Sequence, residues 1–81
     1  MINNFVMLDY RKIITVEPGK RGGQACIRNM RITVSDVLAW LASGMSFQEI
    51  LDDFDELTHE DIIAVLSYAA DRENKIFQVA L

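Results

Sequence analysis

The stretch GGQACIRNMRITV, Gly22–Val34, marks the change from extended to helical patterns in this sequence. Two glycines precede a short apolar step, a turn-like Arg28–Arg31 segment follows, and Ile32–Val34 alternates as a strand does. This pattern predicts a β-hairpin with an arginine at each end of its turn. Because an isolated two-stranded hairpin is at best marginally stable in water, we expect it to pack against other parts of the chain.

Extended patterns precede this stretch and helical patterns follow it. Ile13–Val16 is mostly β-branched and leads into Pro18 and Gly19, which predict a loop before the hairpin. Beyond Val34 the apolar residues recur at intervals of three and four, which is the spacing of a helix that buries one face. The sequence therefore predicts a small sheet followed by helices.

Three helices are predicted between residues 35 and 74. The first ends at Gly44, which stands where a left-handed C-terminal cap belongs. The second begins with the capping box Ser46–Glu49, and the third with the similar Thr58–Asp61. We expect the third helix to end near Glu73. The predicted core-facing residues are Val37, Leu38 and Leu41, then Phe47, Ile50, Leu51 and Phe54, then Ile62, Ile63, Leu66, Ala69 and Ala70.

The predicted fold class is α+β and mainly α, with a short N-terminal β-hairpin followed by a three-helix, helix-turn-helix-like bundle. The 81 residues are expected to form one domain. Residues 1–34 would be its β-rich, basic segment, and residues 35–74 its trihelical unit. Residues 75–81 form an apolar tail, for which a strand, a helical extension and a segment ordered by a partner all remain open.

Charge is distributed unevenly along the chain, whose net charge is −4. Residues 1–34 carry six basic and two acidic residues, whereas residues 35–81 carry two basic and ten acidic residues. Such asymmetry is typical of a solvated surface or of a basic face that binds a partner. The sequence by itself leaves both interpretations open.

The sequence offers no constellation typical of catalysis, cofactor binding or metal binding. Cys26 is the only cysteine, so we expect neither a disulfide within the chain nor a zinc site. The acidic run Asp52–Glu56 lacks the glycine and glutamate spacing of a calcium loop. Gly22 and Gly23 are not followed by the residues of a phosphate-binding loop. We therefore expect a protein that is not an enzyme and has no cofactor or metal.

The expected location is the cytoplasm. The first residues lack the basic start and long apolar core of a signal peptide. No stretch approaches the roughly 18 consecutive apolar residues of a membrane-spanning helix, so no contact with a membrane is expected.

The segment Ile14–Ala70 resembles the domain of unknown function 433 family. Its members look like G-G-K-P-x-I-R-G-T-R-I-x-V, then A-x-G-x-S-x-x-E-I-L, then L-T-x-E-D-I-x-A-A-L-x-Y-A-A. This sequence departs from that pattern at Gln24-Ala25, at Asn29-Met30 and at Asp55. The positions that agree are Gly22, Gly23, Ile27, Arg28, Arg31, Ile32, Val34, Gly44, Ser46, Glu49, Ile50, Leu51, Leu57, Thr58, Glu60, Asp61, Ile62, Ala64, Leu66, Tyr68, Ala69 and Ala70.

The resemblance implies a homeodomain-like helical domain behind a small sheet, and an antitoxin that acts beside a PIN-like ribonuclease toxin. An arginine placed among the metal-binding carboxylates of such a nuclease would make charge-assisted hydrogen bonds. The candidate residues for contact with a partner or with nucleic acid are Arg28 and Arg31, followed by Lys20 and Arg21. The alternative is that the two arginines pair with acidic residues in the helical half of the same chain.

Four residues are assigned to turn and loop geometry. Gly22 and Gly23 are expected to supply positive φ angles in the loop, Asn29 in the hairpin turn and Gly44 at the end of the first helix. Asn tolerates the left-handed region, whereas the adjoining Met30 does not favour it.

Other functions remain open at this stage. One is a stand-alone helix-turn-helix transcription regulator that reads DNA with its third helix, but Glu60 and Asp61 would repel phosphates at the start of that helix. DNA contact, including autoregulation by an antitoxin, is therefore expected from the basic N-terminal half. A structural homodimer domain is a further alternative. We also expect a homodimer, formed by strands that pair across two chains, because the hairpin has unpaired edges and the core is small.

Overall fold

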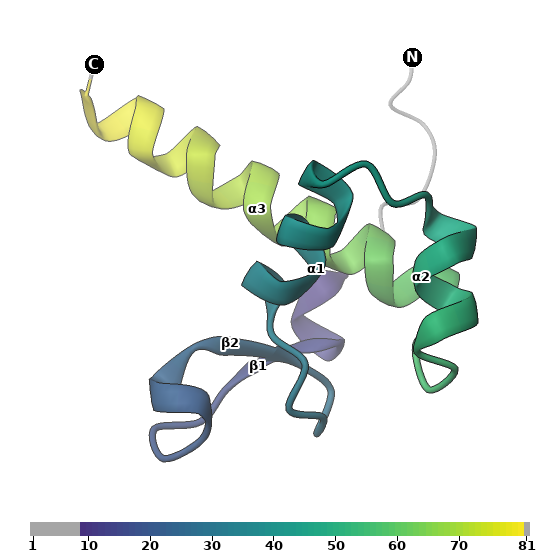
Figure 1. Cartoon of the computed structure of the whole chain (residues 1–81). Coiled ribbons are helices and arrows are strands. Elements are labelled where there is room, and N and C mark those ends of the chain that lie inside the picture. Colours follow the sequence, from purple (N-terminus) through teal and green to yellow (C-terminus); the bar gives the residue numbers. More distant parts are fainter. Residues whose placement is uncertain (1–8, 81) are drawn as a thin grey trace.

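The computed structural model describes the backbone of residues 9–80 and the side chains of residues 9–74 (Figure 1). A small hairpin lies below a group of helices, and the longest helix extends away from that group toward the C-terminus. The elements in chain order are η1 (Tyr10–Lys12), β1 (Ile14–Val16), η2 (Arg21–Gly23), β2 (Ala25–Ile27), α1 (Val34–Ala42), α2 (Phe47–Asp53) and α3 (His59–Ala80). The predicted fold class, a short β-hairpin followed by three helices, is confirmed.

The hairpin pairs β1 with β2, which differs from the pairing predicted within Gly22–Val34. The two strands are antiparallel, with Ile14 opposite Ile27 and Val16 opposite Ala25. Thr33 forms only an isolated bridge with Cys26. The expected second strand at Ile32–Val34 is therefore wrong, because Thr33 is the N-cap of α1 and the chain enters a helix immediately after this single bridge.

The hairpin prediction also assigned the turn geometry to the wrong residue. The positive φ angle lies at Arg28, at +48°, and not at Asn29. The amide of Met30 donates to the carbonyl of Ile27 over 2.9 Å, which closes the turn one residue earlier than expected. Arg28 is held in this conformation because its amide donates to the carbonyl of Ile13, which continues the pairing of the two strands.

The helix starts follow the predicted capping logic. In α2 the Ser46 hydroxyl accepts from the amide of Glu49, and the Glu49 carboxylate accepts from the amide of Ser46. A capping box that the prediction overlooked, Thr33 with Asp36, starts α1 at Val34 rather than at residue 35. Each box satisfies amides that a helix leaves unpaired in its first turn.

The end of α1 is the predicted glycine cap. Gly44 has a φ angle of +102°. Its amide donates to the carbonyl of Leu41, and the amide of Met45 donates to the carbonyl of Trp40. These two bonds form a Schellman motif, which satisfies the last carbonyls of the helix and turns the chain toward α2. The positive φ angles predicted at Gly22 and Gly23 are present as well.

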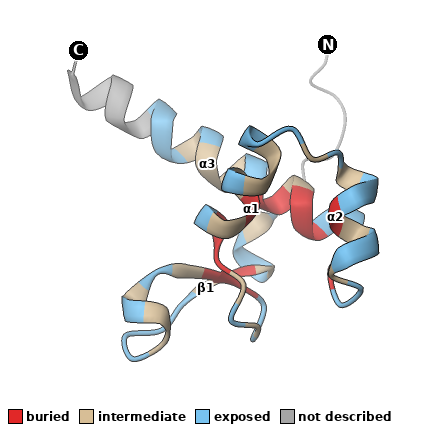
Figure 2. Cartoon of the chain, in the orientation of Figure 1, coloured by how far each residue is buried: buried red, intermediate tan, exposed pale blue. Residues whose placement is uncertain are grey.

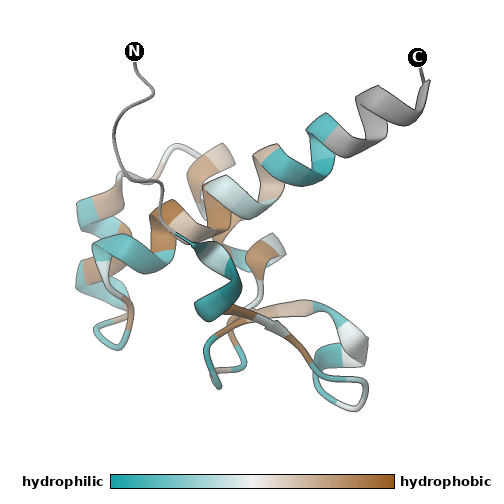
Figure 3. Cartoon of the chain, turned by 180° about the vertical axis from the view of Figure 1, so that it is seen from behind, coloured by the Kyte–Doolittle hydropathy of each residue, from teal (hydrophilic) through white to brown (hydrophobic). Residues whose placement is uncertain are grey.

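The core lies where the hairpin, α1, α2 and the first half of α3 meet (Figure 2). Figure 3 shows hydrophobic residues on the strands and on the part of α3 that crosses this core. The aromatic rings of Trp40 and Phe54 stack with centroids 4.2 Å apart at the edge of this region. The buried apolar residues are Ile14, Cys26, Ile27, Val34, Val37, Ile50, Leu57, Ile62, Ala64 and Val65.

Two expectations for α3 are wrong. Leu66 and Ala70 are exposed, whereas Ala64 and Val65 are buried. The buried face is rotated from the predicted one because α3 packs against α1, the hairpin and α2, so contacts on more than one side select its buried residues. In addition, α3 does not end near Glu73 but continues to Ala80, which makes most of the tail a helical extension. The side chains of residues 75–80 and all of residue 81 lie outside the described residues.

Candidate binding surface

Arg28 joins the hairpin turn to the start of α3. Its Nη2 atom donates to Oδ2 of Asp61 over 2.6 Å and to the carbonyl of Glu56 over 2.8 Å. The side chain of Asp61 is only 3% exposed, while that of Arg28 is 45% exposed. The same carboxylate oxygen accepts from the amide of Thr58, at 2.9 Å. A buried carboxylate is thus neutralised by an arginine 33 residues away in sequence.

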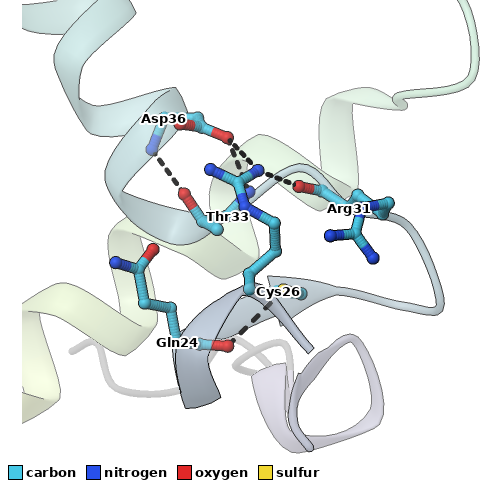
Figure 4. Close-up of polar contacts among 6 residues, drawn as sticks. Gln24, Cys26, Arg31, Thr33 and Asp36 are labelled. Carbon is cyan, nitrogen blue, oxygen red and sulfur yellow. Dashed lines mark hydrogen bonds and ion pairs between the residues drawn. The ribbon is translucent and has the colours of Figure 1, made fainter. Parts of the chain in front are cut away.

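Arg21 makes a matching connection to the start of α1, and Figure 4 labels the residues Arg31, Thr33 and Asp36 that take part in it. Its Nη1 atom donates to the carbonyl of Arg31 and lies 3.4 Å from Oδ2 of Asp36. Asp36 also accepts from the amide of Thr33 at 3.0 Å, while the Thr33 hydroxyl accepts from the amide of Asp36 at 2.9 Å. The Arg21 guanidinium therefore contacts both the capping aspartate of α1 and the backbone at the end of the hairpin turn.

The two arginines share an arrangement that sequence reasoning missed. Arg21 and Arg28 both have positive φ angles, +49° and +48°, which residues with a Cβ atom rarely adopt. Each contacts the aspartate that ends a Thr-x-x-Asp capping box, at position N3 of the helix. The repetition of that motif at Thr33 and Thr58 was visible in the sequence, but the choice of partner depends on how the chain folds.

The four predicted contact residues fall into two pairs. Arg21 and Arg28 are occupied by the contacts described above and are partly exposed. Arg31 is exposed, and within the residues drawn in Figure 4 only its carbonyl takes part in the network, while its guanidinium points away from Asp36. Lys20 is half-buried at the start of η2, where its amide donates to the carbonyl of Glu17. Among the described contacts of these four residues, Arg31 is thus the exposed arginine whose guanidinium forms no ion pair.

An open groove lies beside the hairpin, with a volume of about 740 Å³. Its floor is the face of the sheet that carries Ile14 and Ile27 into the core, continued outward by Val16 and Ala25. Val16 is 58% exposed although it lies on this apolar face. The other lining residues are Gly23, Gln24, Val34, Ser35, Leu38, Tyr68, Ala69, Arg72 and Glu73.

A polar and aromatic contact joins η1 to the middle of α3. The Tyr10 hydroxyl donates to the carboxylate of Asp71, and the Tyr10 ring meets the Tyr68 ring edge-on at 5.6 Å between centroids. The hydrogen bond to Asp71 raises the pKa of Tyr10 above its usual value, because ionisation would remove the donated proton and leave two negative charges side by side. The Arg72 guanidinium lies 5.6 Å from the centre of the Tyr68 ring.

The described part of the chain holds neither a metal-binding cluster nor a membrane-spanning helix. There, no group of three or more His, Cys, Asp and Glu side chains is arranged to hold a metal ion. No helix among the described residues has both the length and the apolar character that crossing a membrane requires.

The fold and this surface define a small α+β protein in which arginines connect a hairpin to two helix starts. The chain belongs to the DUF433 family, described as proteins of unknown function, whose model matches residues 14–69. It is similar to the crystal structure of a DUF433 member protein from Anabaena variabilis, at 35% sequence identity and a TM-score of 0.74. That similarity covers 84% of this chain and 67% of the other. A comparison with curated proteins found no match.

Proposed function

We propose that this chain is a non-catalytic, cytoplasmic binding module that acts as the antitoxin of a PIN-like ribonuclease toxin. In this proposal Arg31 contacts the carboxylates of the toxin's active site. The observation that carries the proposal is an exposed arginine on a turn whose backbone is fixed from several directions. The family resemblance supplies the class of partner.

The fixed turn makes Arg31 a suitable contact residue. The guanidinium of Arg21 binds the carbonyl of Arg31, and the amide of Ile27 donates to the carbonyl of Ile32 over 3.0 Å. A side chain on a backbone that is already ordered loses less conformational entropy when it binds. The planar guanidinium can donate two parallel hydrogen bonds to a carboxylate, so it matches a cluster of acids.

The internal contacts favour Arg31 over Arg28. Withdrawing Arg28 from Asp61 would leave a buried carboxylate without its cation, which is costly in free energy. Arg31 is exposed, and within the described contacts its guanidinium pairs with no carboxylate, so binding a partner would break no such contact. Lys20 adds positive charge next to Arg21 in sequence and would strengthen attraction to an acidic site at long range.

The second candidate, a stand-alone helix-turn-helix regulator, has less support. Glu60 is exposed in the first turn of α3, where a recognition helix would meet the negative charge of DNA. If the antitoxin also regulates its own gene by binding DNA, the basic residues of the N-terminal half are the better candidates for phosphate contacts.

The test is binding to a PIN-like toxin, measured by calorimetry, together with inhibition of its ribonuclease activity. Arg31→Ala should weaken binding roughly 30-fold or more, since it leaves buried acids of the toxin unpaired. Lys12→Ala is the matched control, because it removes an exposed cation of η1 that lies outside the turn. This variant should bind the toxin as the unchanged chain does. Both variants must first show an unchanged circular dichroism spectrum.

Two results would count against this function. If Arg31→Ala binds and inhibits as the unchanged chain does, the arginine contact is wrong. If the unchanged chain binds no PIN-like toxin encoded beside it, the antitoxin assignment itself is wrong.

A further inference from the structure

The groove beside the hairpin is an extension of the core that the described part of the chain leaves open. Ile14 and Ile27 are buried in the core, but Val16 and Ala25 on the same face of the sheet line the groove and are not fully covered. Exposure of 58% at Val16 leaves apolar surface in contact with water. An apolar segment that filled this space would gain free energy from burial.

The walls of the groove restrict what can fill it. Leu38 of α1 lines the groove, and so do Tyr68 and Ala69 of α3. Arg72 and Glu73, one cation and one anion further along α3, line it as well. The occupant should therefore be mainly apolar, with charges of both signs beside its apolar part.

The C-terminal part of α3 has this composition, because Arg72, Glu73 and Lys75 directly precede an apolar stretch. Beyond Glu73 the helix continues to Ala80 and leads away from the rest of the molecule (Figure 1). In the sequence this extension contains Ile76, Phe77 and Val79.

One copy of the chain cannot supply this segment to its own groove. The groove is lined by α3 itself, and the helix is continuous from His59 to Ala80. A second copy can supply it, because two α3 helices crossing about a two-fold axis would each reach the groove of the other. Near such an axis Arg72 of each copy would face Glu73 of its partner, so the charges would be complementary.

We propose that the groove binds the C-terminal end of α3 from a second copy of this chain, forming a symmetric dimer. This dimer differs from the one predicted from the sequence, which joins strand edges. It does not depend on the toxin proposal, since it requires only the chain itself.

The experiment measures the mass of the full-length chain by sedimentation equilibrium at tens of micromolar, an order-of-magnitude choice for a stable interface. The unchanged chain should be a dimer. Ala69→Glu should raise the dimer dissociation constant roughly tenfold or more, because it puts a charge in an apolar groove. Ala70→Glu makes the same change at the next, exposed position of α3, outside the groove, and should leave the dimer intact.

A second variant and a cross-link locate the interface. Val16→Asp changes an exposed side chain, so the monomer should fold while the dimer dissociates. Mixing Val16→Cys and Ile76→Cys chains under oxidising conditions should yield a disulfide-linked heterodimer, while Cys26, only 1% exposed, stays unreactive. A monomeric unchanged chain would overturn the proposal. So would a dimer that Ala69→Glu and Val16→Asp leave unaffected and that does not cross-link.

Discussion

At the scale of single residues, Arg28 combines an unfavourable backbone conformation with a favourable side-chain contact. Its φ angle of +48° is costly for a residue with a Cβ atom. In return its guanidinium reaches Asp61 and the carbonyl of Glu56. Among the described contacts, loss of the side chain would leave a carboxylate that is 3% exposed with only the hydrogen bond from the Thr58 amide.

Arg28→Ala should therefore lower the free energy of unfolding by about 1.5–3 kcal/mol, the range for hydrogen bonds to charged groups. The low end is favoured because the arginine side chain is 45% exposed and partly screened by water. Arg28→Gly should be about 1 kcal/mol less destabilising than Arg28→Ala, because glycine tolerates the positive φ angle. Urea unfolding curves measure both values.

Arg31→Ala is the control for this series, since it removes an exposed arginine three residues away and should change stability by less than about 0.5 kcal/mol. Equal losses for Arg28→Ala and Arg31→Ala would show that the bond to Asp61 contributes little to stability.

Tyr10 provides a test that depends on pH. Its pKa is raised by the hydrogen bond to Asp71, so the bond contributes fully below the unfolded pKa near 10. This contribution is lost as the pH rises through the higher pKa of the folded protein. The difference in unfolding free energy between the unchanged chain and Tyr10→Phe should therefore shrink above pH 10. A difference that stays constant across that range would contradict the assigned bond, and tyrosinate absorbance would follow the ionisation directly.

At the scale of elements, the glycine cap of α1 sets the direction in which α2 begins. An added Cβ at Gly44 would meet no atom within 4 Å, so the reason for glycine there is its φ angle of +102° and not lack of space. The connection from α1 to α2 therefore depends on a backbone conformation that other residues disfavour.

Gly44→Ala should lower the free energy of unfolding by about 1–2 kcal/mol, the cost of holding an L-residue in the left-handed region. Gly19→Ala is the matched control, because an added Cβ there also meets nothing within 4 Å and its φ angle is not in that region. Its effect should be within about 0.5 kcal/mol of zero. Thermal unfolding measures the stability of both variants. A loss confined to Gly44→Ala indicates the cost of the left-handed conformation, whereas equal losses would indicate a general effect of replacing a loop glycine.

At the scale of the whole molecule, the fold partly neutralises the unequal charge of the two halves by forming ion pairs between them. Arg21 and Arg28 bring positive charge from the hairpin to Asp36 and Asp61 at the starts of α1 and α3. The cations of the N-terminal half that remain for long-range attraction include Arg31, which is exposed. Association with a polyanion should consequently be weak and sensitive to salt.

Binding to a nonspecific DNA duplex should fall on neutralising Lys20 and Arg31 together, and the dependence of log affinity on log salt should weaken by about two units. Glu60→Gln, which removes an exposed negative charge from the first turn of α3, should leave affinity equal or higher. Fluorescence anisotropy at several salt concentrations measures both effects. Loss of binding in Glu60→Gln with no change in the double variant would instead indicate a recognition helix.

The features predicted correctly were those that neighbouring residues decide. The capping boxes at Ser46 and Thr58 join residues only three positions apart, and the Gly44 cap involves the turn next to it. The end of α3 was predicted too early, near Glu73 instead of Ala80, because the polar run in the middle of α3 weakens the apolar repeat that would mark a helix.

The candidate site was predicted only in part. The sequence identified Lys20, Arg21, Arg28 and Arg31 as the relevant cations, but it could not separate exposed arginines from internally bonded ones. That separation depends on contacts between residues 15 and 33 positions apart, and many acids in the second half could have served as partners. The groove was missed because it is lined by residues from both strands, α1 and α3.

The sequence by itself determined three helices, their caps and a small extended region before them, because bonds over three to five residues and a repeating apolar face specify these locally. Only the tertiary structure decided that β1 pairs with β2, that Arg28 meets Asp61, and that Val16 lines an open groove. These outcomes require distant segments to meet, and their free energies depend on burial and on the competing partners available in the folded chain. Local propensity carries no information about either.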